Sequence, residues 1–467
     1  MSAAHDAPGT AALLARYDRP GPRYTSYPTA LEFDERFTEA DYRERLAAAD
    51  AHAGEPLSFY AHLPFCEARC LFCGCNVVIT PHREVAARYL ELVLREIGLL
   101  AAALPHRRRV SQMHWGGGTP TYYAPADLET LFAAIAERFE FTPDAEIGIE
   151  VDPRVTSHEH VARLRALGFN RLSMGVQDFA PEVQSAVHRI QGVDVTRALI
   201  ERARAEGYGS INLDLIFGLP HQTLAGFGRT LEEVIALRPD RLAVYSFAYV
   251  PWIKAHMKKL PQEALPDAAL KLELFALAID RLTAAGYRAI GMDHFALPGD
   301  ELSHAVEART LHRNFMGYTV QSARDMVAVG ITAIGDVQAA YVQNVKKLTT
   351  YRDLLAAARL PVERGRRLTA EDRLRRDVIT RLMCNFHLDV REIERAHGVR
   401  FAEHFAPELA ALTGPDSPVA HGLLEVTPAH LALTRLGHRF VRNVCMAFDA
   451  YLPARSAAPK PVFSRTV

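Results

Sequence analysis

The run Ser58-Phe-Tyr-Ala-His-Leu-Pro-Phe-Cys66-Glu-Ala-Arg-Cys70-Leu-Phe-Cys73-Gly-Cys75 joins a predicted strand to a group of cysteines. The chain has six cysteines in 467 residues, and four of them fall within this stretch. Cys66, Cys70 and Cys73 follow a C-x3-C-x2-C pattern, which is typical of an iron–sulfur cluster. Three thiolates leave one iron of a [4Fe-4S] cluster without a protein ligand, so that iron is open to a small molecule.

A zinc site and buried structural thiols are two other interpretations of these cysteines. A structural zinc site usually draws its ligands from two separated pairs, whereas the remaining cysteines, Cys384 and Cys445, stand alone in the sequence. Buried structural thiols are the second alternative, and they do not explain the grouping. Cys75 lies outside the three-cysteine pattern and is not assigned as a ligand.

The strand before the cysteines is the first of a series in which β-branched and aromatic runs alternate with helical patterns. We expect strands at 58–63, 111–115, 146–151, 171–176, 210–217 and 241–247, with a seventh at 288–292. The helices between them are expected at 85–104, 128–139, 161–167, 196–204 and 231–237. This alternation predicts an α/β fold with a parallel sheet, namely a partial (β/α)6 TIM-type barrel.

The predicted barrel, residues 55–300, is flanked by regions of different character. Residues 1–54 are rich in proline and are expected to form an extended arm, with a helix at 39–51, that closes over the barrel as a lid. A connecting region at 301–360 is expected to pack on the barrel. Residues 361–467 are expected to form a mostly helical, winged-helix-like domain with a hairpin at 422–433.

Composition excludes several classes of function. The formal net charge is −1, so no overall field favours nucleic acid or an anionic membrane. No apolar stretch approaches the roughly 20 residues of a membrane span. Residues 1–10 lack the pattern of a secretory signal, so we expect a cytoplasmic protein. We also expect the protein to be a monomer. The basic run Arg107-Arg108-Arg109 is expected to be a solvated connection between helix and strand.

Other candidate residues follow the predicted strands, where barrel enzymes carry their chemistry. The glycines of Trp115-Gly-Gly-Gly-Thr-Pro-Thr121 allow a ligand to approach the backbone, although a tight turn would explain them as well. Glu150 and Asp152 share one face of a strand, and Asp152 is also suited to cap a helix. Gln177, Arg189 and Asp214 lie at further strand ends.

Together these motifs resemble the radical S-adenosylmethionine superfamily and, within it, the oxygen-independent coproporphyrinogen III oxidases. The resemblance covers nearly the whole chain. It includes Arg23-Tyr-Thr-Ser-Tyr-Pro-Thr-Ala30, His114-Trp-Gly-Gly-Gly-Thr-Pro-Thr121, Gly291-Met-Asp-His-Phe295, Leu311-His-Arg-Asn-Phe-Met-Gly-Tyr318 and Cys384-Asn-Phe-His-Leu388.

The resemblance implies a [4Fe-4S] cluster on Cys66, Cys70 and Cys73 and two molecules of S-adenosylmethionine. The molecule on the cluster should contact Tyr60, Gly117, Glu150 and Ile334. The second should contact Phe72, Gly118, Thr119, Gln177, Arg189, Asp214 and Ala248. Tyr60 and His62 are the implied catalytic residues, whereas Phe72 is equally explained as a core residue.

The implied reaction converts two propionate side chains of coproporphyrinogen III to vinyl groups, giving protoporphyrinogen IX in porphyrin biosynthesis. A deoxyadenosyl radical removes a hydrogen atom, and carbon dioxide and one electron are then lost. An electron donor and an electron acceptor are required, and the sequence identifies neither. Arg23 and Arg313 are candidate partners for the substrate carboxylates.

Three alternatives remain from the sequence. A haem chaperone or a haem-degrading enzyme of the same superfamily would have the same cofactors but a different function. Chaperone-type relatives lack the fourth cysteine and the Tyr-Thr-Ser-Tyr-Pro-Thr arm, both of which are present here. A zinc-containing module that binds nucleic acid is disfavoured by the near-zero net charge and the missing second cysteine pair.

Overall fold

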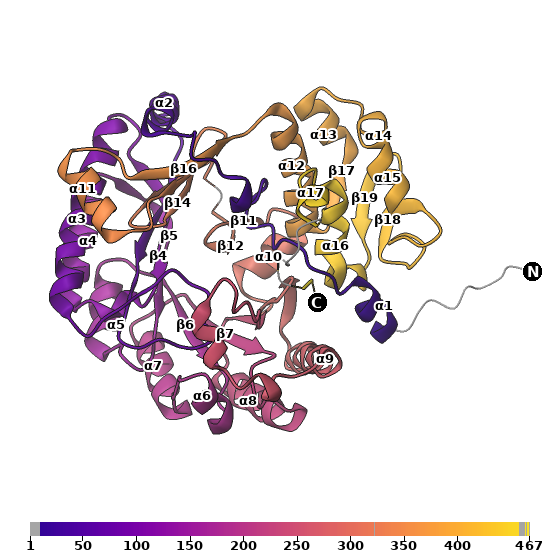
Figure 1. Cartoon of the computed structure of the whole chain (residues 1–467), viewed down its shortest axis with the longest axis horizontal. Helices are drawn as coiled ribbons and strands as arrows, with labels where there is room; N and C mark the ends of the chain where they lie inside the picture. The colour runs from indigo at the N-terminus through magenta and orange to yellow at the C-terminus, as the bar shows by residue number, and fades with distance from the viewer. Residues whose placement is uncertain (1–9, 322, 457–462, 464, 467) are drawn as a thin grey trace, which may run out of the picture.

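The structure is a computed structural model that describes residues 10–321, 323–456, 463 and 465–466. Residues 1–9, which carry most of the segment considered for a secretory signal, lie outside this part. Within it, seven parallel strands form the middle of one sheet, and Figure 1 shows the sheet curving around an open side. In order they are β13 (Asp325–Val329), β1 (Leu57–Leu63), β4 (Arg109–Gly117), β5 (Glu140–Val151), β6 (Arg171–Gln177), β7 (Ser210–Phe217) and β8 (Arg241–Ser246). The predicted partial α/β barrel is confirmed.

The two faces of the sheet differ because side chains alternate along each strand. On β1, Phe59 and Ala61 are fully buried among apolar residues of the core. Polar side chains such as Glu150, Arg171 and Asp214 instead line the inside of the barrel. The apolar core therefore lies between the sheet and its helices, and the inner face is left for polar chemistry.

Helices that follow the strands cover the outer face, as Figure 1 shows. They are α3 (Arg83–Ala103), α4 (Pro125–Ala136), α5 (His158–Ala166), α7 (Val193–Ala205) and α8 (Leu224–Leu237), with α6 (Pro181–Ala186) before α7 and α9 (Ala268–Ala284) after β8. Local signals set their starts. The hydroxyl of Ser157 accepts a hydrogen bond from the His160 amide at the start of α5, and Thr223 does the same for Gly226 at the start of α8. A capping side chain thus satisfies free amides at the starts of α5 and α8, whereas α3, α6 and α7 begin without a side-chain cap.

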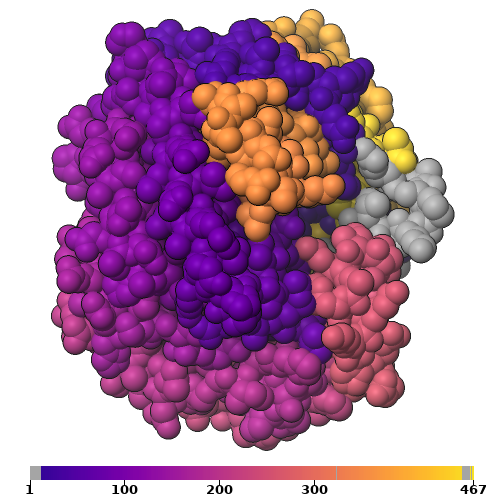
Figure 2. All heavy atoms as spheres, turned by 60° about the vertical axis from the view of Figure 1, so that its left-hand side comes forward, coloured from indigo at the N-terminus to yellow at the C-terminus, as the bar shows by residue number. Residues whose placement is uncertain are grey.

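Both edges of the sheet are antiparallel. The expected seventh strand exists as β9 (Arg288–Gly291), but it pairs with β10 (His294–Ala296) in a hairpin, and β10 pairs antiparallel with β8. A short turn between β9 and β10 leaves no room for the crossover that a parallel pair requires. At the other edge lie β14 (Ile334–Asp336), β15 (Ala340–Asn344) and β16 (Val362–Arg367). The region 301–360 therefore contributes strands to the sheet itself, and α11 (Leu348–Ala356), orange in Figure 2, lies over the first third of the chain.

The prediction that the basic run 107–109 is solvated is wrong for Arg107, whose side chain is fully buried. Its guanidinium donates to the carbonyl oxygens of Glu55 at 3.0 Å and Pro56 at 3.1 Å and forms an ion pair with Asp325. A buried cation is tolerated only with such partners. Arg107 thereby fixes the start of β1 against the start of β13, a pairing that the sequence did not indicate.

The N-terminal segment connects the barrel with the C-terminal region. Helix α1 (Thr10–Tyr17) lies beside the C-terminal region and α2 (Glu39–Asp50) lies on the barrel, as Figure 1 shows. Between them Tyr24 donates to Asp449 at 3.0 Å, and the Tyr27 carbonyl accepts from Tyr341 at 3.2 Å. Both tyrosine side chains are buried. The expected arm is thus packed into the fold in this structure.

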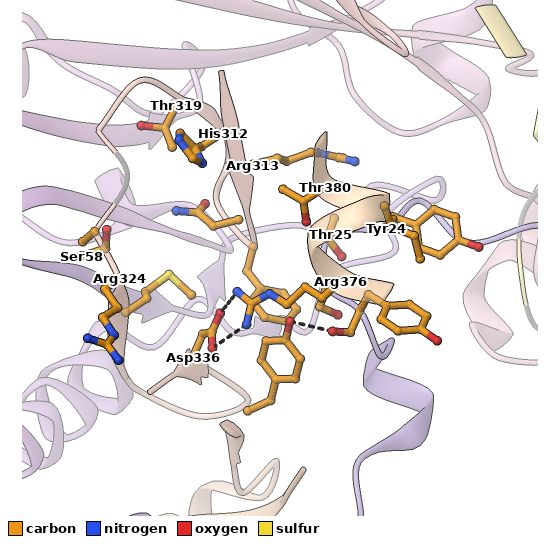
Figure 3. Close-up of a pocket in the computed structure, with 18 residues that line it drawn as sticks. Tyr24, Thr25, Ser58, His312, Arg313, Thr319, Arg324, Asp336, Arg376 and Thr380 are labelled. Carbon is orange, nitrogen blue, oxygen red and sulfur yellow. Dashed lines mark hydrogen bonds and ion pairs between the residues drawn. The ribbon is translucent and has the colours of Figure 1, made fainter. Parts of the chain in front are cut away.

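The C-terminal region combines helices with a small sheet. Helix α12 (Ala370–Asn385) is followed by β17 (His387–Asp389) and α13 (Val390–His397), and the expected hairpin is present as β18 (Leu424–Val426) and β19 (His430–Leu433). In Figure 3, Arg376 of α12 reaches Asp336 of β14 beside Tyr24 and Thr25 of the arm, and the two charged groups form an ion pair. No described helix has the length and apolar character needed to cross a membrane.

Candidate functional site

The predicted site residues meet at the carboxyl ends of the parallel strands. A cavity of about 540 Å³ lies there. Thirteen of the residues singled out from the sequence line it: Cys66, Cys70, Phe72, Cys73, Cys75, Gly117, Gly118, Thr119, Glu150, Asp152, Gln177, Arg189 and Asp214. They come from five strands and the loops that follow, and the parallel sheet brings their ends to one place.

Cysteines 66, 70 and 73 sit on a loop framed by two short strands, β2 (Phe65–Cys66) and β3 (Val78–Ile79). All three are partly exposed to the cavity, and Cys75 is more exposed. Within the part of the chain that the structure describes, no three His, Cys, Asp or Glu side chains converge as ligands of a single metal ion. A zinc site needs that convergence, whereas a cluster binds each cysteine through a different iron.

Two arginines place positive charge beside Cys70. Arg154 and Arg189 each lie 3.8 Å from its sulfur. The Asp152 carboxylate accepts from both, at 2.6 Å from Arg154 and 2.9 Å from Arg189. Burial opposes ionisation of Asp152, but the two guanidinium groups hold its pKa below the ordinary value. Asp152 thus orients two cations that offset the charge of a thiolate ligand.

Arg189 keeps one donor for a bound molecule. Its terminal nitrogens donate to Asp152 and, at 2.7 Å, to the Gly175 carbonyl oxygen. Its Nε atom is buried and has no partner within the described residues. A buried donor without a partner is costly. Because Arg189 lines the cavity, a ligand there would satisfy it.

The glycine loop after β4 is closely packed. Gly117 has a φ of +114°, and a Cβ atom there would lie 2.6 Å from the His62 ring. A Cβ atom on Gly118 would lie 2.5 Å from the backbone carbon of Pro64. The Gly117 amide donates to Glu150 at 3.0 Å. A larger residue at either position would displace the wall of the cavity, so packing requires both glycines, and the positive φ of Gly117 is a second requirement there.

Tyr60 and His62, the predicted catalytic pair, lie behind this loop and do not line the cavity. The His62 Nε2 atom donates to the Asn76 carbonyl oxygen at 3.1 Å, which leaves Nδ1 to accept from the Tyr60 hydroxyl at 3.1 Å. Burial lowers the pKa of His62 and, together with the nearby Glu150, raises that of Tyr60. Both side chains are therefore neutral and tie β1 to the cysteine loop.

Two carboxylates on the inner face have unequal ionisation. Burial opposes the charge of Glu150, but His114 and the Gly117 amide lower its pKa overall. Burial raises the pKa of Asp214 to about 7, against the hydrogen bond from Asn212 at 2.8 Å. Glu150 is thus ionised at neutral pH, and Asp214 exchanges its proton there. Both also line a smaller pocket of about 140 Å³ that continues into the barrel.

Several predicted residues are placed elsewhere. Ala248 and Ile334 do not line the cavity. Arg23, a candidate substrate cation, is paired with the buried Asp293, and Arg313 donates to the Arg23 carbonyl oxygen. Sequence reasoning missed Arg154, because an arginine two residues after Asp152 in a loop carries no signal of its own.

Comparison with known proteins assigns the chain. The model of the Radical SAM superfamily matches residues 60–234, and that of the HemN C-terminal domain matches residues 368–440. The oxygen-independent coproporphyrinogen III oxidase of Salmonella typhimurium is 46% identical over 457 residues, covering 98% of each chain. The chain belongs to the oxygen-independent coproporphyrinogen III oxidase family. The Synechocystis member of this family is 42% identical over 462 residues, with 98% of each chain covered.

A solved structure agrees with this assignment. Coproporphyrinogen III oxidase (HemN) from Escherichia coli, described as a radical SAM enzyme, superposes with a TM-score of 0.88 at 44% identity, covering 92% of this chain and 97% of that one. This protein is therefore a radical SAM oxidoreductase, with a [4Fe-4S] cluster and S-adenosylmethionine as cofactors. The three half-exposed thiols, the free Arg189 donor and the cavity beside them suit both groups.

Proposed function

We propose that this protein carries out the oxygen-independent oxidative decarboxylation of two propionate side chains of coproporphyrinogen III, giving protoporphyrinogen IX. The observation that carries the proposal is the meeting of three cysteines with Glu150 and Arg189 around one cavity. Near-complete coverage of relatives that bear the name of this oxidase supports the same substrate.

The cysteines 66, 70 and 73 would hold the cluster, and the other cavity residues would hold S-adenosylmethionine. When bound, these groups supply a carbon-centred radical that removes a hydrogen atom from the propionate β-carbon. Glu150 is ionised and would accept hydrogen bonds from an ammonium or a ribose of the bound molecule. The Nε–H of Arg189 would donate to an oxygen of the bound molecule.

The two neighbouring pockets suggest how the substrate approaches the cofactor. The cavity of about 540 Å³ and the inner pocket of about 140 Å³ share the side chains of Glu150, Ser173, Asp214 and Tyr245. A propionate that enters between them would lie beside Asp214, which takes or gives a proton near neutral pH. The surrounding side chains exclude water from the reacting carbon. A second S-adenosylmethionine, Tyr60 and His62 as catalytic residues, and roles for Ala248 and Ile334 stay predictions, as do the cytoplasmic location and the monomer.

The test is an anaerobic reaction of the reconstituted protein with coproporphyrinogen III, S-adenosylmethionine and dithionite. The expected products are carbon dioxide and a porphyrinogen with two vinyl groups, detected by fluorescence after oxidation. Cys70→Ser should abolish both cluster absorbance and product. Cys384→Ala, which changes a buried cysteine of the C-terminal region, should retain both.

The same reaction separates the alternatives. Tight haem binding without any product from coproporphyrinogen III would assign the protein as a haem chaperone. Loss of haem absorbance that depends on S-adenosylmethionine would assign it as a haem-degrading enzyme. Either result would overturn the proposal while leaving the cluster and the fold unchanged.

A further inference from the structure

The surface around the cysteine loop carries exposed apolar side chains. Trp252 is 47% exposed and Ile253 is 57% exposed, and both lie in the loop after β8. Ile190, after α6, is 65% exposed. Large apolar groups that face solvent together are typical of a surface that binds another protein.

These residues belong to segments that hold the cysteine loop from two sides. Lys254 donates to the Cys75 carbonyl oxygen at 3.1 Å, and His256 donates to that of Cys73 at 2.9 Å. From the other side, the Leu71 amide donates to the Val187 carbonyl oxygen at 3.0 Å. Leu71, Val187 and Met257 share one apolar cluster. The exposed apolar groups are thus attached directly to the loop that carries the cluster ligands.

Cations outnumber acids on this surface. The cysteine loop and the loop after β8 contain Arg69, Lys254, Lys258 and Lys259, whereas of the adjacent acids Glu67 pairs with Arg83 and Glu263 is exposed. Lys258 and Lys259 are exposed. Within the described part of the chain, none of the four forms an ion pair. The cysteine loop therefore has cations beside it that no carboxylate neutralises, and these attract acidic surfaces.

We propose that this surface, Arg69, Ile190, Trp252, Ile253, Lys254, Lys258 and Lys259, docks an acidic one-electron carrier protein that reduces the cluster. This proposal depends on the proposed function in one respect, because both require that the cluster be reduced. One electron leaves the reduced flavin or iron–sulfur centre of the carrier and enters the cluster, so the carrier is oxidised by one electron and the cluster is reduced by one.

The arrangement suits this occupant better than a second copy of the chain. A two-fold pair would bring the same lysines face to face, and like charges repel across such a contact. An acidic carrier would place its charges against the lysine rim and its apolar centre against Trp252. Lys254 contacts the backbone of Cys75, two residues from the predicted ligand Cys73, so a docked carrier would lie close to the cluster.

The test uses the reconstituted full-length enzyme and fully reduced flavodoxin as the carrier. Stopped-flow bleaching of the cluster absorbance gives the rate of reduction, and calorimetry at low salt gives the affinity. Lys258→Glu/Lys259→Glu should lower the second-order rate about tenfold or more and reduce its dependence on salt. Trp252→Ser should weaken binding about tenfold and leave the salt dependence unchanged. The matched control, Arg391→Glu/Arg395→Glu on α13, changes the net charge equally and should react like the wild type.

Turnover with dithionite separates this inference from the proposed function. All variants should retain the wild-type rate with dithionite, because a small reductant needs no docking surface. Equal rates of reduction by flavodoxin in the lysine variant and the wild type would overturn the docking proposal. So would a wild type that fails to react with flavodoxin, or self-association that Trp252→Ser abolishes. A protein that flavodoxin reduces at the expected rates but that forms no product would contradict only the proposed function.

Discussion

Gly117→Ala tests whether the glycine loop holds S-adenosylmethionine in the way the geometry suggests. The backbone at Gly117 has a φ of +114°, where a residue with a Cβ atom is strained by about 1–3 kcal/mol. The new Cβ atom would lie 2.6 Å from the His62 ring, so the ring must move. Movement would break at least one hydrogen bond of His62, to Tyr60 or Asn76, at about 1 kcal/mol.

The sum is about 2–4 kcal/mol. If S-adenosylmethionine binds only when the loop and the His62 ring are in their original positions, its affinity falls by about 30- to 1,000-fold. Calorimetry of S-adenosylmethionine binding to the reconstituted variant measures this loss, and cluster absorbance shows that the cluster is intact. Gly74→Ala is the matched control, because it lies in the cysteine loop and its Cβ atom would have no neighbour within 4 Å. An affinity of Gly117→Ala within about threefold of the wild type would refute the reasoning.

Three further predictions concern stability and the cluster. Arg107→Met should lower the free energy of unfolding by about 3–5 kcal/mol in denaturant titration, because it leaves the Asp325 charge buried without its partner, whereas the exposed Arg109→Met should change it little. Burial raises the pKa of Glu96 to about 7. The stability that this residue contributes is therefore fully present below pH 4.5 and is lost as pH rises through 7, a decline of about 3 kcal/mol. In thermal melts across this pH range, Glu96→Gln should show a smaller decline. Cys75→Ser should keep the visible cluster absorbance, and its loss would show that Cys75 is a ligand.

The sequence predicted the central fold well because its signals are local. The period of two in the strands and the helical spacing between them depend only on which face each residue buries. The expected strands 58–63 and 210–217 therefore match β1 and β7 closely. The same holds for the cysteine trio, since its spacing lies within one loop.

The sheet edges could not be predicted in this way. The run 288–292 was identified as a strand, but its antiparallel pairing depends on the short turn to β10 and not on its own residues. β13 lies beside β1 although more than 260 residues separate them, and the buried pair of Arg107 and Asp325 joins them. From the sequence, Arg107 was indistinguishable from its solvated neighbours.

The sequence by itself determined the chemistry of this protein, because three cysteines at fixed spacing and a glycine loop after a strand are local properties of the chain. Only the tertiary structure decided which side chains surround the cysteines and the cavity. It brought Asp152, Arg154 and Arg189 around Cys70, moved Tyr60 and His62 behind the cavity wall, and set free lysines around the cysteine loop. Those contacts join residues far apart in the chain, so they depend on how strands and loops pack and not on any local pattern.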